Sequence, residues 1–274
     1  MKQRIIVAVI ALPFVFLALV YFPVFILTGA VSLVCILMAY ELLNAVMPFK
    51  SNKKHFIYTI LAAAVIPIGT YFDINHFLFP AILLALMSLI FLEAIVRFNT
   101  ENHHPIIYVF VALFGGIIIP YLLSTVLNLR LMEHGRYLVL IPVICAFVTD
   151  AGAYFVGVLF GKHKAFPKVS PKKTIEGCVG GIVIGTLSMV LYGVYLINFS
   201  AVGDVNFIIL IIYGLAGSII CELGDLAFSL IKREFNVKDY GQLLPGHGGA
   251  LDRFDSMVFT APIIYLLVLI LPVF

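Results

Sequence analysis

Long runs of apolar residues, separated by short polar stretches, dominate the pattern along this chain. Each run approaches the ~20 residues that a helix needs to cross the hydrocarbon core of a bilayer. We therefore expect an all-α fold, a polytopic bundle of about nine transmembrane helices. The expected spans are 4–21, 23–45, 55–72, 76–96, 105–127, 136–160, 177–198, 206–231 and 256–273.

The first two spans are divided only by Tyr21, Phe22 and Pro23, which predicts a tight hairpin. The first run has no small-residue cleavage site, so we expect a retained span rather than a signal peptide. No internal repeat, low-complexity tract or linker interrupts the chain. The pattern therefore predicts one membrane domain over residues 1–274.

Composition supports a membrane protein and excludes an ordinary soluble domain. Hydrophobic residues make up 63% of the chain and charged residues 11%, and the mean hydropathy is +1.14. The cysteines lie in apolar segments without CxxC spacing, so they are predicted to be packing residues rather than disulfides or metal ligands. They are Cys35, Cys145, Cys178 and Cys221.

The distribution of lysine and arginine predicts the orientation. With a cytoplasmic N-terminus and nine spans, only Arg130 and Arg136 of the 17 basic residues fall outside. The C-terminus is then extracytoplasmic, and the polar loops 161–176 and 232–255 emerge on the cytoplasmic face of the inner membrane. The basic residues expected inside are Lys2, Arg4, Lys50, Lys53, Lys54, Arg97, Lys162, Lys164, Lys168, Lys172, Lys173, Lys232, Arg233, Lys238 and Arg253.

Five acidic residues fall within the expected spans, where an unpaired charge is costly. Glu41 and Glu93 lie near cytoplasmic span ends, and we expect them to reach the interface. Asp150 lies well within its span, with no basic residue within a helical turn. Glu222 and Asp225 share one helical face and repel each other unless a cation or a proton separates them. A protonated packing pair is the alternative.

The first polar loop reads GKHKAFPKVSPKKTIEG and carries a candidate anion site. Ser170 and Pro171 resemble an N-cap and a first helical position, so we expect the next helix to begin near Lys172 and Lys173. Free backbone N–H groups and two ammonium groups would attract an anion there. Alternatively, the lysines bind anionic lipid head groups, and the loop alone leaves both interpretations open.

The second polar loop contains PGHGG, whose glycines allow tight turns and close approach of backbone N–H groups to a ligand. Lys232 and Arg233 precede this loop and follow Asp225 by about two helical turns. The alternative is a flexible turn without a ligand. Glycines alone therefore do not decide the function of this loop.

Asp252 and Asp255 follow PGHGG and are spaced to point the same way from one helix. Carboxylate oxygens suit Mg²⁺, which favours a few carboxylates with phosphate oxygens and water. The alternative is that these acids only complement the helix dipole. Intramembrane carboxylates, basic residues and Gly-rich backbone on one side together predict phosphoryl or nucleotidyl transfer at the membrane surface.

A longer signature carries a family resemblance. The run SLIKREFNVKDYGQLLPGHGGALDRFDS, residues 229–256, closely resembles the signature of the integral-membrane phosphatidate cytidylyltransferases, also called CDP-diacylglycerol synthases. The resemblance extends to TDAGAYFVGVLFGKHKAFPKVSPKKTIEG at 149–177 and GDL at 224–226, whereas the N-terminal spans match only in general character. It implies that phosphatidate and CTP react in phospholipid biosynthesis to give CDP-diacylglycerol and pyrophosphate.

The same resemblance implies which residues act. Asp225 and Asp252 are the expected metal-linked carboxylates, with Asp255 as a further candidate ligand and Asp150 close to the site. The cofactor is expected to be Mg²⁺, with a second cation left open. Residues 136–274 would carry the site, and residues 1–135 would serve packing or oligomer contacts. The expected substrate-binding residues are Ser170, Lys172, Lys173, Lys232, Arg233, His247, Gly248, Gly249 and Arg253.

Three positions depart from the family pattern. Ala151 stands where a hydroxyl residue is common, Phe228 where a glutamate is common, and Tyr240 where a serine is common. These departures remove no proposed metal ligand, but they put in doubt hydroxyl contacts at 151 and 240 and a carboxylate role at 228. Glu222 is a candidate to replace that carboxylate in part.

Other functions remain as alternatives. The Asp-Gly and Ala-Arg pattern of CDP-alcohol phosphotransferases is missing from the sequence. A CTP-dependent lipid kinase stays open, and pyrophosphate rather than CDP as product would exclude it. A cation-coupled transporter would also hold acids within spans, but no inverted repeat is evident. The expected partners are CTP, phosphatidate and membrane lipids, with no nucleic acid, and a homodimer is left open.

Overall fold

The structure is a computed structural model that describes residues 16–98, 100, 105–200, 202–241 and 248–274. Within these residues, seven helices are long and apolar enough to cross a membrane, which confirms a helical polytopic membrane protein. The total of nine spans and the orientation stay predictions, because the first expected span lies largely outside the described residues. The seven are Val24–Val46, Asn75–Arg97, Ile106–Leu131, Gly135–Phe160, Ile175–Phe199, Phe207–Glu234 and Leu251–Ile270.

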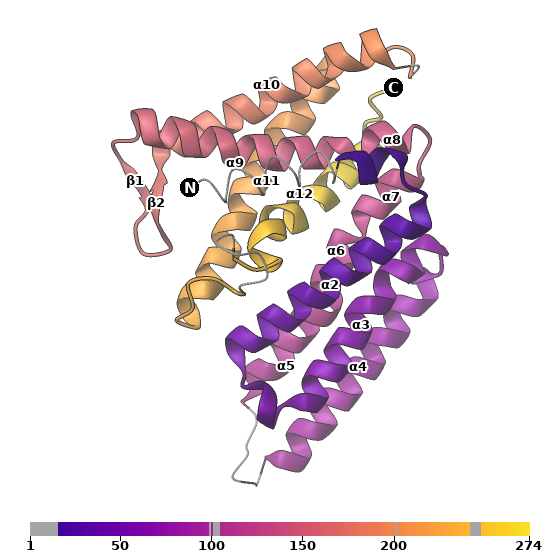
Figure 1. Cartoon of the computed structure of the whole chain (residues 1–274), viewed down its shortest axis with the longest axis vertical. Helices are drawn as coiled ribbons and strands as arrows, with labels where there is room; N and C mark the ends of the chain where they lie inside the picture. The colour runs from indigo at the N-terminus through magenta and orange to yellow at the C-terminus, as the bar shows by residue number, and fades with distance from the viewer. Residues whose placement is uncertain (1–15, 99, 101–104, 201, 242–247) are drawn as a thin grey trace. The chain divides into compact units, whose positions relative to one another are not determined.

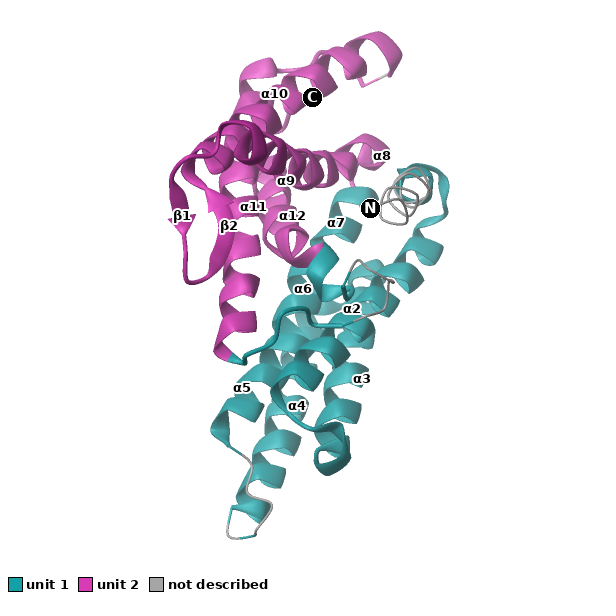
Figure 2. Cartoon of the chain, turned by 60° about the vertical axis from the view of Figure 1, so that its left-hand side comes forward, with its two compact units in different colours: residues 1–131, 235–253 teal, residues 132–234, 254–274 magenta. Residues whose placement is uncertain are grey.

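The chain forms two compact units (Figure 2). Unit 1 comprises Met1–Leu131 and Phe235–Arg253, and unit 2 comprises Met132–Glu234 and Phe254–Phe274. The signature run 229–256 is therefore divided between the two units.

Unit 1 is built from helices (Figure 1). The expected span 55–72 is the helix α3, but it is not one of the seven, since two lysines and a histidine occupy its first turn. The expected span 105–127 contains a π-helical turn, Phe114–Ile118, which includes Gly115 and Gly116. The elements are α2 Val24–Val46, η1 Phe49–Ser51, α3 Lys53–Tyr71, α4 Asn75–Arg97, α5 Ile106–Leu113, η2 Phe114–Ile118, α6 Ile119–Leu123 and α7 Thr125–Leu131.

Both acids that were expected to reach the interface from unit 1 are buried instead. Glu93 is 8% exposed, and its carboxylate pairs with His55 Nδ1 at 3.1 Å and with Arg97 Nη2 at 2.7 Å. Glu41 is 6% exposed and binds backbone N–H groups. The expectation is wrong because partners from other segments let each carboxylate remain inside the unit.

Unit 2 contains the other long helices and a small hairpin. A glycine every fourth residue, at Gly177, Gly181 and Gly185, brings α10 close to its neighbours: a Cβ on Gly181 would lie 2.9 Å from the carbonyl oxygen of Thr149 in α9. Small residues commonly permit such close packing of membrane helices. The elements are α8 Gly135–Leu138, α9 Leu140–Phe160, β1 Lys164–Phe166, β2 Ser170–Thr174, α10 Ile175–Phe199 and α11 Phe207–Glu234. Helix α12, Leu251–Ile270, belongs to unit 2 from residue 254 onward.

The hairpin β1–β2 corrects the prediction for the first polar loop. Ser170 does not cap a helix; it pairs with Phe166 in an antiparallel ladder. The N-cap of α10 is Thr174, whose Oγ1 accepts the N–H of Gly177 at 3.1 Å. Because this later threonine caps the helix, the segment with Ser170 and both lysines remains extended.

Candidate functional site

A pocket of about 470 Å³ in unit 2 gathers five of the predicted site residues. This volume lies within the range typical of small-molecule sites. The pocket is formed by α9, the β1–β2 hairpin, α10 and α11. The predicted residues that line it are Asp150, Ser170, Lys172, Lys173 and Asp225; the others are Ala153, Tyr154, Gly157, Val158, Lys164, Thr174, Gly177 and Cys178.

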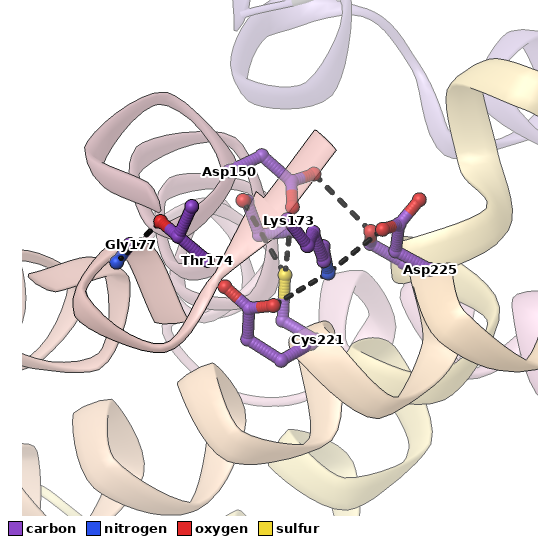
Figure 3. A network of polar contacts seen from close by, with 9 residues as sticks. Asp150, Lys173, Thr174, Gly177, Cys221 and Asp225 are labelled. Atoms are coloured by element: carbon purple, nitrogen blue, oxygen red, sulfur yellow. Dashed lines mark hydrogen bonds and ion pairs between the residues drawn. The ribbon is translucent and has the colours of Figure 1, made fainter. Parts of the chain in front are cut away.

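Lys173 lies between the two carboxylates of α11. Its Nζ is 2.5 Å from Glu222 Oε2 and 2.7 Å from Asp225 Oδ2, and Figure 3 shows the side chain pointing toward Asp225. The prediction that a cation or proton must separate Glu222 and Asp225 is therefore confirmed, and the cation is an ammonium of the chain itself.

Electrostatics keep Lys173 charged in this setting. Burial alone would lower the pKa of the ammonium, but the charges of Asp225 and Glu222 outweigh it and raise the pKa above its ordinary value. The side chain of Lys173 is only 16% exposed. A buried lysine with two acidic partners holds its proton at physiological pH.

Asp150 faces the same pocket from α9. Its Oδ2 accepts the hydroxyl of Ser256 at 3.1 Å, and its Oδ1 accepts the thiol of Cys221 at 3.5 Å (Figure 3). Asp255 is 7% exposed and accepts the N–H of Ser256 at 2.8 Å. The charges of Asp150, Asp225 and Asp255 interact with one another, so negative charge concentrates beside the pocket.

The donors of this site suit only some kinds of metal binding. Among the described residues, no group of three or more His, Cys, Asp or Glu side chains is placed to hold one ion. In the part of the chain that the structure describes, side chains alone therefore form no metal cage. Mg²⁺ is usually held by one or two carboxylates together with substrate phosphates and water, and clustered carboxylates fit that mode.

The predicted cations of unit 2 have different surroundings. Lys172 is exposed where it lines the pocket. Lys164, which was not predicted to bind substrate, is also exposed and lines the same pocket. Arg233 donates from Nε to the carbonyl oxygen of Val169 at 3.1 Å, which ties α11 to the hairpin turn. The charge of Lys232 interacts with that of Asp255. Lys172 and Lys164 are thus the cations most open to a phosphate in the pocket.

Asp252 belongs to unit 1 and organises the end of the glycine loop. Its Oδ2 accepts the N–H of Tyr240 at 2.8 Å and the N–H of Gly249 at 3.0 Å. Gly248 has φ +80°, a conformation that favours glycine. Arg253 follows in the first turn of α12. His247 lies outside the described residues, as do residues 242–246.

Glu41, which was expected to reach the interface, instead binds the segment that leads into Asp252. Its two carboxylate oxygens accept the N–H groups of Ala250 at 2.9 Å and Leu251 at 2.8 Å, at the start of α12. The available signal was an acid within a span that had no neighbouring partner. Its partners lie 209 and 210 residues later, so spacing along the chain did not identify them.

The three departures have clear structural surroundings. Phe228 is fully buried and packs edge-on against Phe259, with ring centroids 6.2 Å apart, so position 228 is part of the core. Ala151 is exposed. Tyr240 is buried and contributes its backbone N–H to Asp252. At position 240 the main chain therefore supplies a donor whatever the side chain.

The model of the cytidylyltransferase family matches residues 2–271. A Haemophilus influenzae protein named phosphatidate cytidylyltransferase is 34% identical over 283 residues, which cover 96% of each chain. Proteins of the same name are 41% identical over 138 residues in Bacillus subtilis and 40% over 137 in Staphylococcus haemolyticus. The match to the Bacillus subtilis protein covers 50% of this chain and 49% of the relative. The match to the Staphylococcus haemolyticus protein covers 50% of this chain and 51% of the relative.

Proposed function

The chain belongs to the cytidylyltransferase family, and on this premise we propose that it is a phosphatidate cytidylyltransferase. It transfers the cytidylyl group of CTP to phosphatidate and releases CDP-diacylglycerol and pyrophosphate. The observation that carries this proposal for the molecule itself is the pocket of unit 2, where acids and lysines meet beside apolar helices. Such a pocket suits a polyphosphate and the phosphate of a lipid.

The chemistry requires alignment more than proton transfer. An oxygen of the phosphatidate phosphate attacks the α-phosphorus of CTP, the bond to the β-phosphate oxygen breaks, and pyrophosphate leaves. A phosphate monoester is already anionic near neutral pH, so no strong general base is needed. The enzyme must reduce the repulsion between two polyanions and hold them in line.

In this proposal the lysines of the hairpin bind phosphate. Lys172 and Lys164 are exposed in the pocket and offer ammonium groups without a buried ion pair to break. Ser170 offers a hydroxyl from the same strand as Lys172. Lys173 keeps Glu222 and Asp225 from repelling each other and supplies positive charge within reach of a bound phosphate.

The metal ligands are proposed from the family pattern and from the chemistry of the carboxylates. The family pattern supports Asp225 and Asp252 as metal-linked carboxylates, with Asp255 as a further candidate ligand and Asp150 as a residue close to the site. When bound, the ion would neutralise charge on the triphosphate and polarise the α-phosphate. The other proposed phosphate contacts are Lys232, Arg233, His247, Gly248, Gly249 and Arg253.

We also propose that the pocket opens to the cytoplasmic side of the inner membrane. The excess of lysine and arginine in the loops assigned to that side supports the orientation. CTP is a cytoplasmic nucleotide, whereas phosphatidate lies in the bilayer. A site at the membrane surface gives access to both substrates.

A direct assay tests the proposal. Purified protein in mixed micelles with phosphatidate, CTP and Mg²⁺ should form a CDP-lipid and an equal amount of pyrophosphate. The Asp225→Asn variant, shown to be folded by its elution from size-exclusion chromatography, should lose this activity. Release of CDP with a phosphorylated lipid would instead identify a lipid kinase, and no reaction by the folded wild type would refute the proposal.

A further inference from the structure

We infer that Glu41 is a positioning residue for Asp252, acting on it through the segment 249–251. This inference rests on the proposed function, because it assigns Asp252 a part in the reaction. It gives helix α2, in the N-terminal half of the chain, a direct part in building the site. All the contacts that carry it lie within unit 1.

Glu41 forms a pair of hydrogen bonds with the start of α12. Glu41 Oε1 accepts the N–H of Ala250 at 2.9 Å, and Oε2 accepts the N–H of Leu251 at 2.8 Å. These donors have no partner within the helix, because the first N–H groups of any helix are left over. A carboxylate that accepts both fixes the direction in which α12 begins.

Asp252 directly follows Ala250 and Leu251, and its carboxylate binds the other end of the same segment at Gly249. Asp252 Oδ2 accepts the N–H of Gly249 and the N–H of Tyr240. Residues 249–251 therefore form a short strap. Glu41 binds its middle and its end, at Ala250 and Leu251, and Asp252 binds its beginning, at Gly249. A shift of the strap would move the carboxylate of Asp252 with it.

Two glycines of this region lie in close steric contact with Glu41. A Cβ on Gly249 would collide with the carboxylate of Glu41, and so would a Cβ on Gly241. Glycine at these two positions is thus explained by the approach of Glu41, in addition to any contact with a ligand. The carboxylate of Glu41 therefore fits beside these residues only because neither of them carries a side chain.

Glu93 provides the matched control. It is also a buried glutamate of unit 1, it lies on α4, and its partners are His55 and Arg97 rather than the strap. Glu93→Gln perturbs a buried carboxylate of the same unit without touching residues 249–252. Glu41→Gln keeps the size of the side chain but replaces one acceptor oxygen by an NH₂ group that faces an N–H donor.

The test compares activity with backbone protection. Glu41→Gln should lower kcat about tenfold or more, since small misplacements of reacting groups cost that much or more. Hydrogen exchange, measured without CTP or metal, should become faster in the peptide that contains residues 249–252. Glu93→Gln should change neither quantity by more than about twofold, whatever it does to the melting temperature.

A double-mutant cycle gives a second measurement. Gly249→Ala should be harmful while Glu41 is present, because the new Cβ meets the carboxylate. In a Glu41→Ala background the carboxylate is gone, so the same change should cost at least fivefold less activity. This coupling stays measurable even if one single variant has lost much of its activity.

The outcomes separate the two proposals. A wild-type protein that forms no CDP-lipid would refute the proposed function, and the exchange data would still decide whether Glu41 holds the strap. An active wild type with Glu41→Gln equal to Glu93→Gln in both kcat and exchange, or with additive effects of the two changes in the cycle, would overturn the positioning role.

Discussion

The ammonium of Lys173 should be a main stabiliser of unit 2, and its removal gives the sharpest stability prediction. Lys173→Met keeps most of the side-chain volume but leaves Glu222 and Asp225 on one helical face without the cation that separates them. Removing one partner of a buried ion pair typically costs 3–5 kcal/mol. Because Asp225 is 26% and Lys173 16% exposed, we expect the lower end, about 3 kcal/mol.

Controls follow from the same contacts. Lys168→Met changes an exposed lysine of the hairpin turn and should alter the unfolding free energy by about 0.5 kcal/mol or less. Adding Glu222→Gln to Lys173→Met removes one of the uncompensated charges and should recover about half of the loss. Denaturant titration in detergent micelles measures these differences. A Lys173→Met protein as stable as the wild type, or a double variant no more stable than the single one, would refute the reasoning.

The pH dependence of this difference has a definite sign. The pKa of Lys173 is raised in the folded protein, so its contribution is complete below the pKa of an unfolded lysine, about 10.4, and is lost only at higher pH. The wild type should therefore exceed Lys173→Met by the same free energy at pH 7 and pH 9. An advantage that grew between these values would show that burial, not the two carboxylates, controls the ammonium.

Three further changes have defined outcomes. Asp252→Asn keeps one oxygen to accept the backbone N–H groups, so the protein should stay folded in detergent. Because the variant lacks the negative charge, it should lose the transfer activity, and turnover like the wild type would exclude a role for that charge. Lys172→Ala should raise the apparent KM for a substrate about tenfold, the effect of losing ~1.4 kcal/mol of binding, whereas Lys168→Ala should not; unchanged KM values would favour lipid anchoring. Gly181→Ala should destabilise the protein by about 1–3 kcal/mol through overpacking, whereas Gly29→Ala, whose Cβ meets nothing within 4 Å, should not; equal stabilities would contradict the close packing.

Hydrophobic patterning predicted the described helices because each span must satisfy its backbone internally, which leaves a long apolar run as a local signal. The hairpin was missed because Ser170-Pro171 has the local features of a helix start. Only the later competitor Thr174, with its bond to Gly177, decides where α10 begins. The local sequence does not show whether Ser170 or Thr174 is the N-cap of α10.

The site shows the same division between local and distant information. Two acids one helical turn apart predicted a cation or a proton between them, because that repulsion is a property of one helix. The identity of the cation, Lys173, depends on a hairpin that begins 58 residues before Glu222, and the partners of Glu41 lie more than 200 residues away. Such contacts follow from how helices pack, which spacing along the chain does not encode.

The most direct test of the proposed function follows the label of CTP into the products. Wild-type protein in micelles with phosphatidate and Mg²⁺ should place the α-phosphorus label in the lipid product and the γ-phosphorus label in pyrophosphate. Transfer of the γ-label to the lipid, or no labelled lipid from a folded protein, would contradict cytidylyl transfer.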